Sequence, residues 1–102
     1  MARELQDTLG QKLVAYAIGD RHPKSVGRYA RGERHPEDAA LARLIDLYIL
    51  WGVLKQGSLT PGAAKMWMLG ANPILGRAPS EAFHEGQASQ VIGAAKAFVS
   101  MR

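Results

Sequence analysis

The chain has 102 residues, 47% of them hydrophobic and 22% charged, which is the balance of an ordinary globular protein with one modest core or two very small ones. It contains no cysteine, which excludes disulfides and thiolate metal sites and favours a reducing, cytoplasmic location. The net charge of +4 favours an acidic partner, and the longest apolar run, Leu47 to Leu54, is too short to cross a bilayer. Glu4 and Asp7 interrupt the N-terminal residues, so we expect no signal peptide.

Three helices are predicted in the first half of the chain. Apolar residues recur at helical spacing from about Arg3 to Ile18 and predict one helix, or two short ones, ended by Gly19. A second helix is predicted from Pro23 to Arg31, because proline suits a first helical turn. The third and longest is predicted from Pro36 to about Lys55.

The apolar stripe of this longest helix is wider than a surface helix needs. Two interpretations stay open: the helix is central to the core, or its stripe forms a subunit interface. The stripe consists of Leu41, Leu44, Ile45, Tyr48, Leu50, Trp51 and Leu54.

A break at Gln56 to Ser58 is the expected boundary between residues 1–56 and 57–102. Thr60 and Pro61 start a helix that reaches Leu69, and a loop follows over residues 71–78. A brief helix is expected from Pro79, and a last one from about Ala88. No strand is predicted, so the fold class is all-α. The residues expected in the core of this half are Met66, Trp67, Met68, Leu69, Phe83 and Phe98.

The whole net charge of the chain lies in a basic segment, Arg21 to Arg34. This segment holds five basic residues and one acid, Glu33, which sum to +4, whereas the remaining eight basic and eight acidic residues cancel. Such a localised positive field attracts a polyanion. The alternative is a solvated helix face on which the charges cluster by accident.

The basic segment fits a helix-turn-helix motif. Leu13 to Ile18 would form its first helix, Gly19 to His22 the turn, and Pro23 to Arg31 the helix that enters the major groove of double-stranded DNA. Its inward residues would be Val26, Tyr29 and Ala30. We expect the DNA contacts to come from Arg21, Lys24, Ser25, Arg28, Arg31 and Arg34.

No catalytic or metal-binding pattern is found. The three histidines, His22, His35 and His84, form no i, i+4 pair, and no carboxylate cluster completes a metal set. Glu81 and Glu85 lie one helical turn apart and are expected on a solvated or partner-binding face rather than in acid–base chemistry. We therefore predict a binding protein without a cofactor rather than an enzyme.

Several motifs, in this order, resemble a family of bacterial antitoxins. Leu9 to Tyr16 and Ser25 to Gly32 resemble their Xre-like helix-turn-helix. The second half resembles the toxin-binding domain of the Xre/MbcA/ParS-like class, which has a tryptophan helix, an Asn-Pro turn, a Gly-x-x-Pro helix start, a glycine and a valine-rich last helix. In this chain the matching residues are Trp67, Asn72 and Pro73, Gly76 to Pro79, Gly86, and Val91 to Phe98.

The resemblance implies an N-terminal Xre-like helix-turn-helix bundle followed by a small helical toxin-binding domain. It implies a RES-domain toxin as partner, which consumes NAD by phosphorolysis, hydrolysis or ADP-ribosyl transfer and whose active site the antitoxin covers. It also implies repression of the antitoxin's own operon, and a homodimer or a toxin–antitoxin hetero-oligomer. The expected toxin contacts are Trp67, Asn72, Arg77, Glu81, Glu85, Lys96 and Arg102.

Two other functions stay open. The chain could be a stand-alone transcriptional regulator whose second half only dimerises. It could also be a scaffold whose helix-turn-helix no longer binds DNA. A stand-alone regulator differs from an antitoxin only in its partner. A scaffold differs in that substitution of Arg28 and Arg31 by alanine would have no effect on DNA binding.

Overall fold

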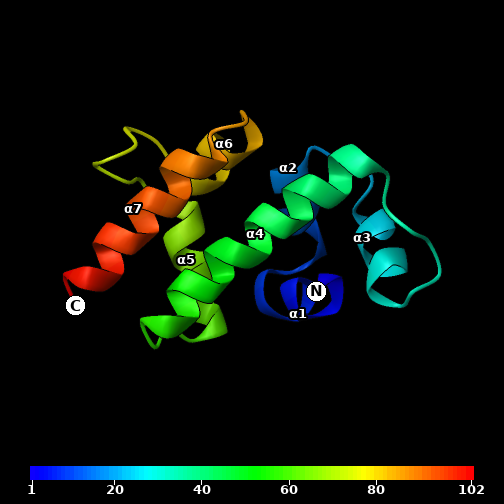
Figure 1. The fold of residues 1–102 in the computed structure, drawn as a ribbon, viewed down its shortest axis with the longest axis horizontal. Helices are drawn as coiled ribbons and strands as arrows, with labels where there is room; N and C mark the ends of the chain where they lie inside the picture. Colours follow the sequence, from blue (N-terminus) through cyan, green and yellow to red (C-terminus); the bar gives the residue numbers. More distant parts are fainter.

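The computed structural model describes all residues from Met1 to Arg102 and consists of seven helices (Figure 1). They are α1 (Ala2–Leu9), α2 (Gln11–Ile18), α3 (Pro23–Ala30), α4 (Asp38–Gln56), α5 (Pro61–Leu69), α6 (Pro79–His84) and α7 (Ala88–Ser100). The only β pairing is an isolated bridge between Asn72 and Arg77. The all-α fold class is therefore confirmed.

Gly10 divides the first predicted helix into two. Its φ of 86° lies in the left-handed region, which favours glycine, and its N–H donates to the carbonyl of Gln6 at 2.9 Å. Of the two possibilities that the sequence left open, two short helices are therefore confirmed. Gly19, with φ 78° and ψ 21°, ends α2 as a left-handed cap.

The turn from Gly19 to His22 connects α2 to α3, and the two helices pack against each other. The Asp20 carboxylate accepts a hydrogen bond from the backbone N–H of His22 at 2.8 Å, and Pro23 occupies the first turn of α3. Val26 is fully buried against the rest of the protein, and Tyr29 packs against the same core. The inward positions predicted for Val26 and Tyr29 are thus confirmed, and Ala30 is partly buried.

The wide stripe of α4 is divided between two environments. Leu44, Leu47, Leu50, Trp51 and Leu54 are buried. Three neighbours that point the other way remain exposed: Ile45 at 44%, Tyr48 at 39% and Ile49 at 48%. The interpretation that this helix is central to the core is therefore correct for the buried residues of the stripe, and its exposed residues leave the interface interpretation open. No helix has both the length and the apolar character needed to span a membrane.

One hydrophobic core joins the two halves of the chain. It consists of 20 buried residues, with Leu5 and Val14 from the first half in the same cluster as Met68, Phe83 and Val91 from the second. In Figure 1, α4 runs along the molecule and α7 lies beside it, and these two helices pack together. The hydrophobic core thus continues across Gln56, and the boundary there remains a prediction about function.

The helices after residue 57 begin where proline and threonine predict them. Thr60 Oγ1 accepts a hydrogen bond from the N–H of Ala63 at 3.2 Å, and Pro61 follows as the first helical residue. Phe83 is buried as expected. Met66, Leu69 and Phe98, however, are 75%, 55% and 36% exposed, so their assignment to the core is wrong. Met66 and Leu69 are exposed because α5 buries only one narrow face, which is formed by Ala64 and Met68.

Candidate functional site

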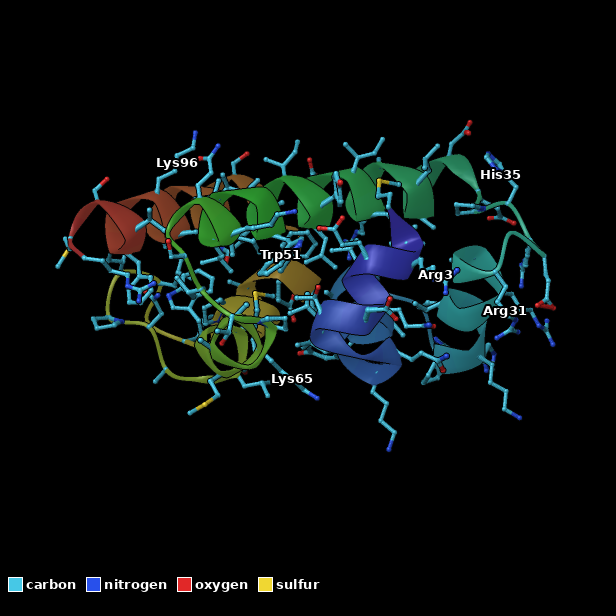
Figure 2. All side chains as sticks on the ribbon, turned by 90° about the horizontal axis from the view of Figure 1, so that it is seen from below. Arg3, Arg31, His35, Trp51, Lys65 and Lys96 are labelled. Atoms are coloured by element: carbon cyan, nitrogen blue, oxygen red, sulfur yellow. The ribbon has the colours of Figure 1, made fainter.

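The outer face of α3 carries three exposed cations. Lys24, Arg28 and Arg31 lie at i, i+4 and i+7 and are all exposed, as the helical spacing predicted. Figure 2 shows Arg31 at the end of the molecule formed by α1 and α3. No neighbouring helix covers this face, so long cationic side chains extend freely from it.

Ser25 does not belong to this exposed face. Its side chain is only 6% exposed, because it lies on the side of α3 that includes Val26 and packs against α1 and α2. The prediction of Ser25 as a DNA contact is therefore wrong in this structure. Gly27 lies on the same side, and a methyl group there would come within 2.7 Å of Gln11 Nε2.

Arg31 forms an ion pair with Glu33 at the end of α3. Both side chains are more than half exposed, so this pair adds little to folding stability. The hydrogen bond from Arg31 lowers the pKa of the Glu33 carboxyl, with a smaller effect from the charges of Arg31 and Arg28. Glu33 therefore stays ionised and offsets part of the positive charge of this segment.

Arg21 and Arg34 lie around a separate hollow next to α3. This hollow has a volume of about 420 Å³ and also contains Arg43, together with the acids Asp20 and Glu37. Both Arg21 and Arg34 are exposed. The structure thus brings these two predicted DNA contacts together, but not on the face that holds the other cations.

Sequence spacing alone missed Arg3, which adds a cation at the same end of the molecule. Arg3 is exposed on α1, and α1 packs against α3 (Figure 2). It lies far from the basic segment in the sequence, so only the packing of α1 on α3 places it there. No local pattern could have assigned it to this surface.

The predicted toxin contacts near the C-terminus form an aromatic cluster with Phe98. The Trp67 ring is half-buried, and its centroid lies 6.1 Å from that of Phe98. The guanidinium of Arg102 lies 5.8 Å from the Phe98 ring and donates a hydrogen bond to the carbonyl of Gly57 at 2.7 Å. Arg102 would have to leave this position before it could enter a partner's pocket.

Three other predicted toxin contacts form hydrogen bonds that stabilise the conformation of the loop before α6 and the start of that helix. The Asn72 side chain accepts hydrogen bonds from the N–H groups of Ile74 at 3.0 Å and Leu75 at 3.3 Å. Arg77 Nη2 donates to the Glu81 carbonyl at 3.1 Å, and Glu81 Oε1 accepts from the N–H of Ala78 at 3.4 Å. These polar groups therefore shape the loop first, as Asn72 was expected to do.

Glu85 and Lys96 are exposed, and no ion pair joins either of them to the aromatic cluster. Sequence reasoning missed the apolar residues that the second half leaves exposed. We call them the second-half apolar residues: Met66, Leu69, Ile74, Phe98 and Met101, with exposures of 75%, 55%, 64%, 36% and 83%. They come from α5, the loop after it, and the end of α7.

His84 has a structural contact rather than a catalytic one. Its ring stacks on Tyr16 with centroids 4.3 Å apart, and its Nδ1 lies 2.6 Å from the Tyr16 carbonyl. Arg43 Nη1 donates to the His84 carbonyl at 3.2 Å and to the Ala17 carbonyl at 3.4 Å. These contacts join α2, α4 and α6.

The arrangement suits binding by charge at one end and by apolar contact at the other. No group of three or more His, Cys, Asp or Glu side chains is placed to hold a metal ion. Compared with protein-family models, curated proteins and solved structures, the chain matches none of them.

Proposed function

We propose that the protein is an antitoxin that neutralises a RES-domain, NAD-consuming toxin by binding over its active site and that represses its own operon by binding DNA. The DNA-binding part of this proposal rests on the uncovered cationic face of α3, which lies within the segment that holds the whole net charge of the chain. The toxin half follows from the resemblance of the second half to the antitoxin class and is supported by its exposed apolar residues.

For DNA binding, α2 and α3 act as the helix-turn-helix and α3 enters the major groove. Lys24 lies near the N-terminal end of α3, the end that reaches base edges in this motif. Arg28 and Arg31 extend the same face and reach guanine edges or phosphates. On approach to DNA, Arg31 exchanges Glu33 for a phosphate or a base. Ser25 is left out of this contact set because it is buried.

For toxin binding, the second-half apolar residues supply the central contacts. Interface cores are rich in aromatic residues and methionine, and this half exposes Met66 and Met101 as well as Phe98, which lies beside Trp67. Glu85 and Lys96 would form a polar rim. Exposed apolar side chains that form one patch mark protein–protein interaction sites, and we propose that these residues act in this way.

We further propose a homodimer formed through the outer face of α4. Ile45 and Ile49 lie one turn apart on this helix and are both close to half exposed. A two-fold dimer would place two α3 helices on half-sites about one helical turn of DNA apart.

Co-expression with the product of the adjacent gene tests the toxin half. An antitoxin co-purifies with that product and relieves the growth arrest that it causes. A chain that binds operator DNA but neither captures nor neutralises the product is a stand-alone regulator, and this result refutes the antitoxin proposal.

The salt dependence of DNA affinity tests the other half. Four or five cations per protomer that neutralise phosphates give a log–log slope of roughly −4 per protomer. A slope near zero on operator DNA would identify a scaffold that has lost DNA binding.

A further inference from the structure

A groove lies between the α1–α2 junction and the helices α5 and α6. Its volume is about 830 Å³. One wall comes from the first half of the chain and the other from the second half. It is lined by Leu9, Gly10, Gln11, Lys12, Leu13, Tyr16, Pro23, Lys65, Leu69, Ala78, Ser80 and Glu81.

Three positive features meet in this groove, and Glu81 is the one acid among its lining residues. The N-terminus of α2 lies in it, and no side chain caps that end. A methyl group built on Gly10, the residue before α2, would lie 3.6 Å from Lys65 Nζ. Neither Lys12 nor Lys65 forms an ion pair. Because a helix N-terminus is itself positive, these cations are unfavourably placed until an anion joins them.

Ser80 adds a hydrogen-bonding group to the second wall. Its side chain is only 4% exposed and lines the groove, and no hydrogen bond joins its hydroxyl to another group of the chain. A hydroxyl that faces the groove without a partner can bond to a ligand that enters it. Glu81 is the one acid in the groove, and its carboxylate already accepts a hydrogen bond from the N–H of Ala78.

We propose that this groove binds an acidic, leucine-rich segment of a partner protein. A carboxylate of the segment lies at the α2 N-terminus between Lys12 and Lys65, where it accepts backbone N–H and Ser80 hydroxyl hydrogen bonds. An apolar side chain next to that carboxylate packs against the exposed Leu69.

The walls favour a protein segment over a nucleic acid. Leu69 and Tyr16 are 55% and 42% exposed and offer apolar surface to a leucine side chain, and a sugar–phosphate backbone has nothing comparable to place there. The groove is separate from the outer face of α3, and it stands on its own geometry rather than on the proposed antitoxin function. A segment bound here touches both halves of the chain at once.

The experiment titrates the full chain, labelled with ¹⁵N, with a short acetylated peptide of alternating leucine and aspartate and with its asparagine counterpart. The acidic peptide is expected to shift the amide signals of Gln11, Lys12 and Leu13, and the asparagine peptide to bind about tenfold more weakly. Lys65→Glu should weaken the acidic peptide by about tenfold or more, and Lys65→Gln by less.

Lys96→Glu is the matched control, because Lys96 is also an exposed lysine and projects on the opposite side of the molecule from Lys65 (Figure 2). It should leave peptide affinity unchanged, and circular dichroism should show equal helix content in all variants. Equal binding of the two peptides, or no binding, would overturn the proposal. So would a DNA duplex that shifts the same amides and displaces the acidic peptide. None of these readouts involves the toxin, so their failure is distinct from that of the antitoxin proposal.

Discussion

The basic segment and the second-half apolar residues lie on one folded unit but offer opposite kinds of surface. Arg28 and Arg31 extend from α3 at one end of a molecule 40 Å long, whereas Met101 belongs to the other end (Figure 1). Charge-driven binding weakens with salt, and burial of apolar surface does not. One small core can therefore support two partners of unlike chemistry. Changes in salt concentration and single substitutions should affect binding of the two partners separately.

The largest expected effect is on DNA affinity. The double substitution Arg28→Ala and Arg31→Ala should cost about 1–3 kcal/mol for each arginine that contacts a base, because both side chains are exposed and Arg31 can exchange Glu33 for DNA. Fluorescence anisotropy with operator DNA measures the loss. Lys96→Ala removes one exposed charge from α7 and should change affinity little. If the double variant also lost toxin binding, the two surfaces would not be separate.

Met66→Asp should disrupt toxin binding by the second-half apolar residues without affecting DNA binding by the basic segment. Met66 is 75% exposed, so the substitution leaves the core intact, but a charge buried in a protein interface costs about 2 kcal/mol or more. Capture of the toxin should fall accordingly while DNA affinity is unchanged. Ser89→Asp adds the same charge at an exposed polar position and serves as the control. Normal toxin capture by Met66→Asp would place the toxin interface elsewhere.

Gly57→Ala tests whether the two regions share one cooperative core. A methyl group at Gly57 would lie 2.6 Å from Val99 Cγ2, where α4 meets α7, so overpacking should destabilise the protein by about 1–3 kcal/mol. Thermal unfolding should remain a single transition at a lower temperature. Gly93→Ala meets nothing within 4 Å in the middle of α7 and should stabilise by about 0.5–1 kcal/mol. Two separate transitions would show that the halves fold independently.

The smallest expected effect concerns Glu4, which attaches α1 to α4. Its carboxylate accepts hydrogen bonds from Trp51 Nε1 at 2.6 Å, Lys55 Nζ at 3.2 Å and Tyr48 OH at 3.4 Å. The Trp51 hydrogen bond, then that of Lys55, lowers the pKa of the Glu4 carboxyl. Its stabilising contribution is therefore present above the pKa of the unfolded chain and is lost as pH falls through the lower folded pKa.

Glu4→Gln should therefore be less stable than the parent at pH 7, with the difference shrinking under acid. Urea unfolding at pH 7 and pH 3 measures this difference. Asp7→Gln is the control, since Asp7 is an exposed acid on the same helix and forms no ion pair. A difference that grew at low pH would contradict the assigned role of the carboxylate.

Much of the candidate site was predictable from sequence because helical spacing and proline positions are local signals. The face shared by Lys24, Arg28 and Arg31 follows from the 3.6-residue period once α3 is placed after Pro23. The rest depends on distant neighbours. Ser25 is adjacent in sequence to an exposed lysine, yet it is buried because α1 and α2 cover its side of α3.

Local signals in the chain set where the helices begin and end and where the charge lies. Gly19, Pro23, Pro61 and Pro79 act through their own backbone geometry, and net charge is a sum over residues. Packing between distant segments sets which side of each helix is covered. It leaves Met66 and part of the α4 stripe exposed, and it brings Lys65 to Gly10 to form the groove. The physical reason is that burial is set by whichever helix packs alongside, and that helix can lie anywhere in the chain.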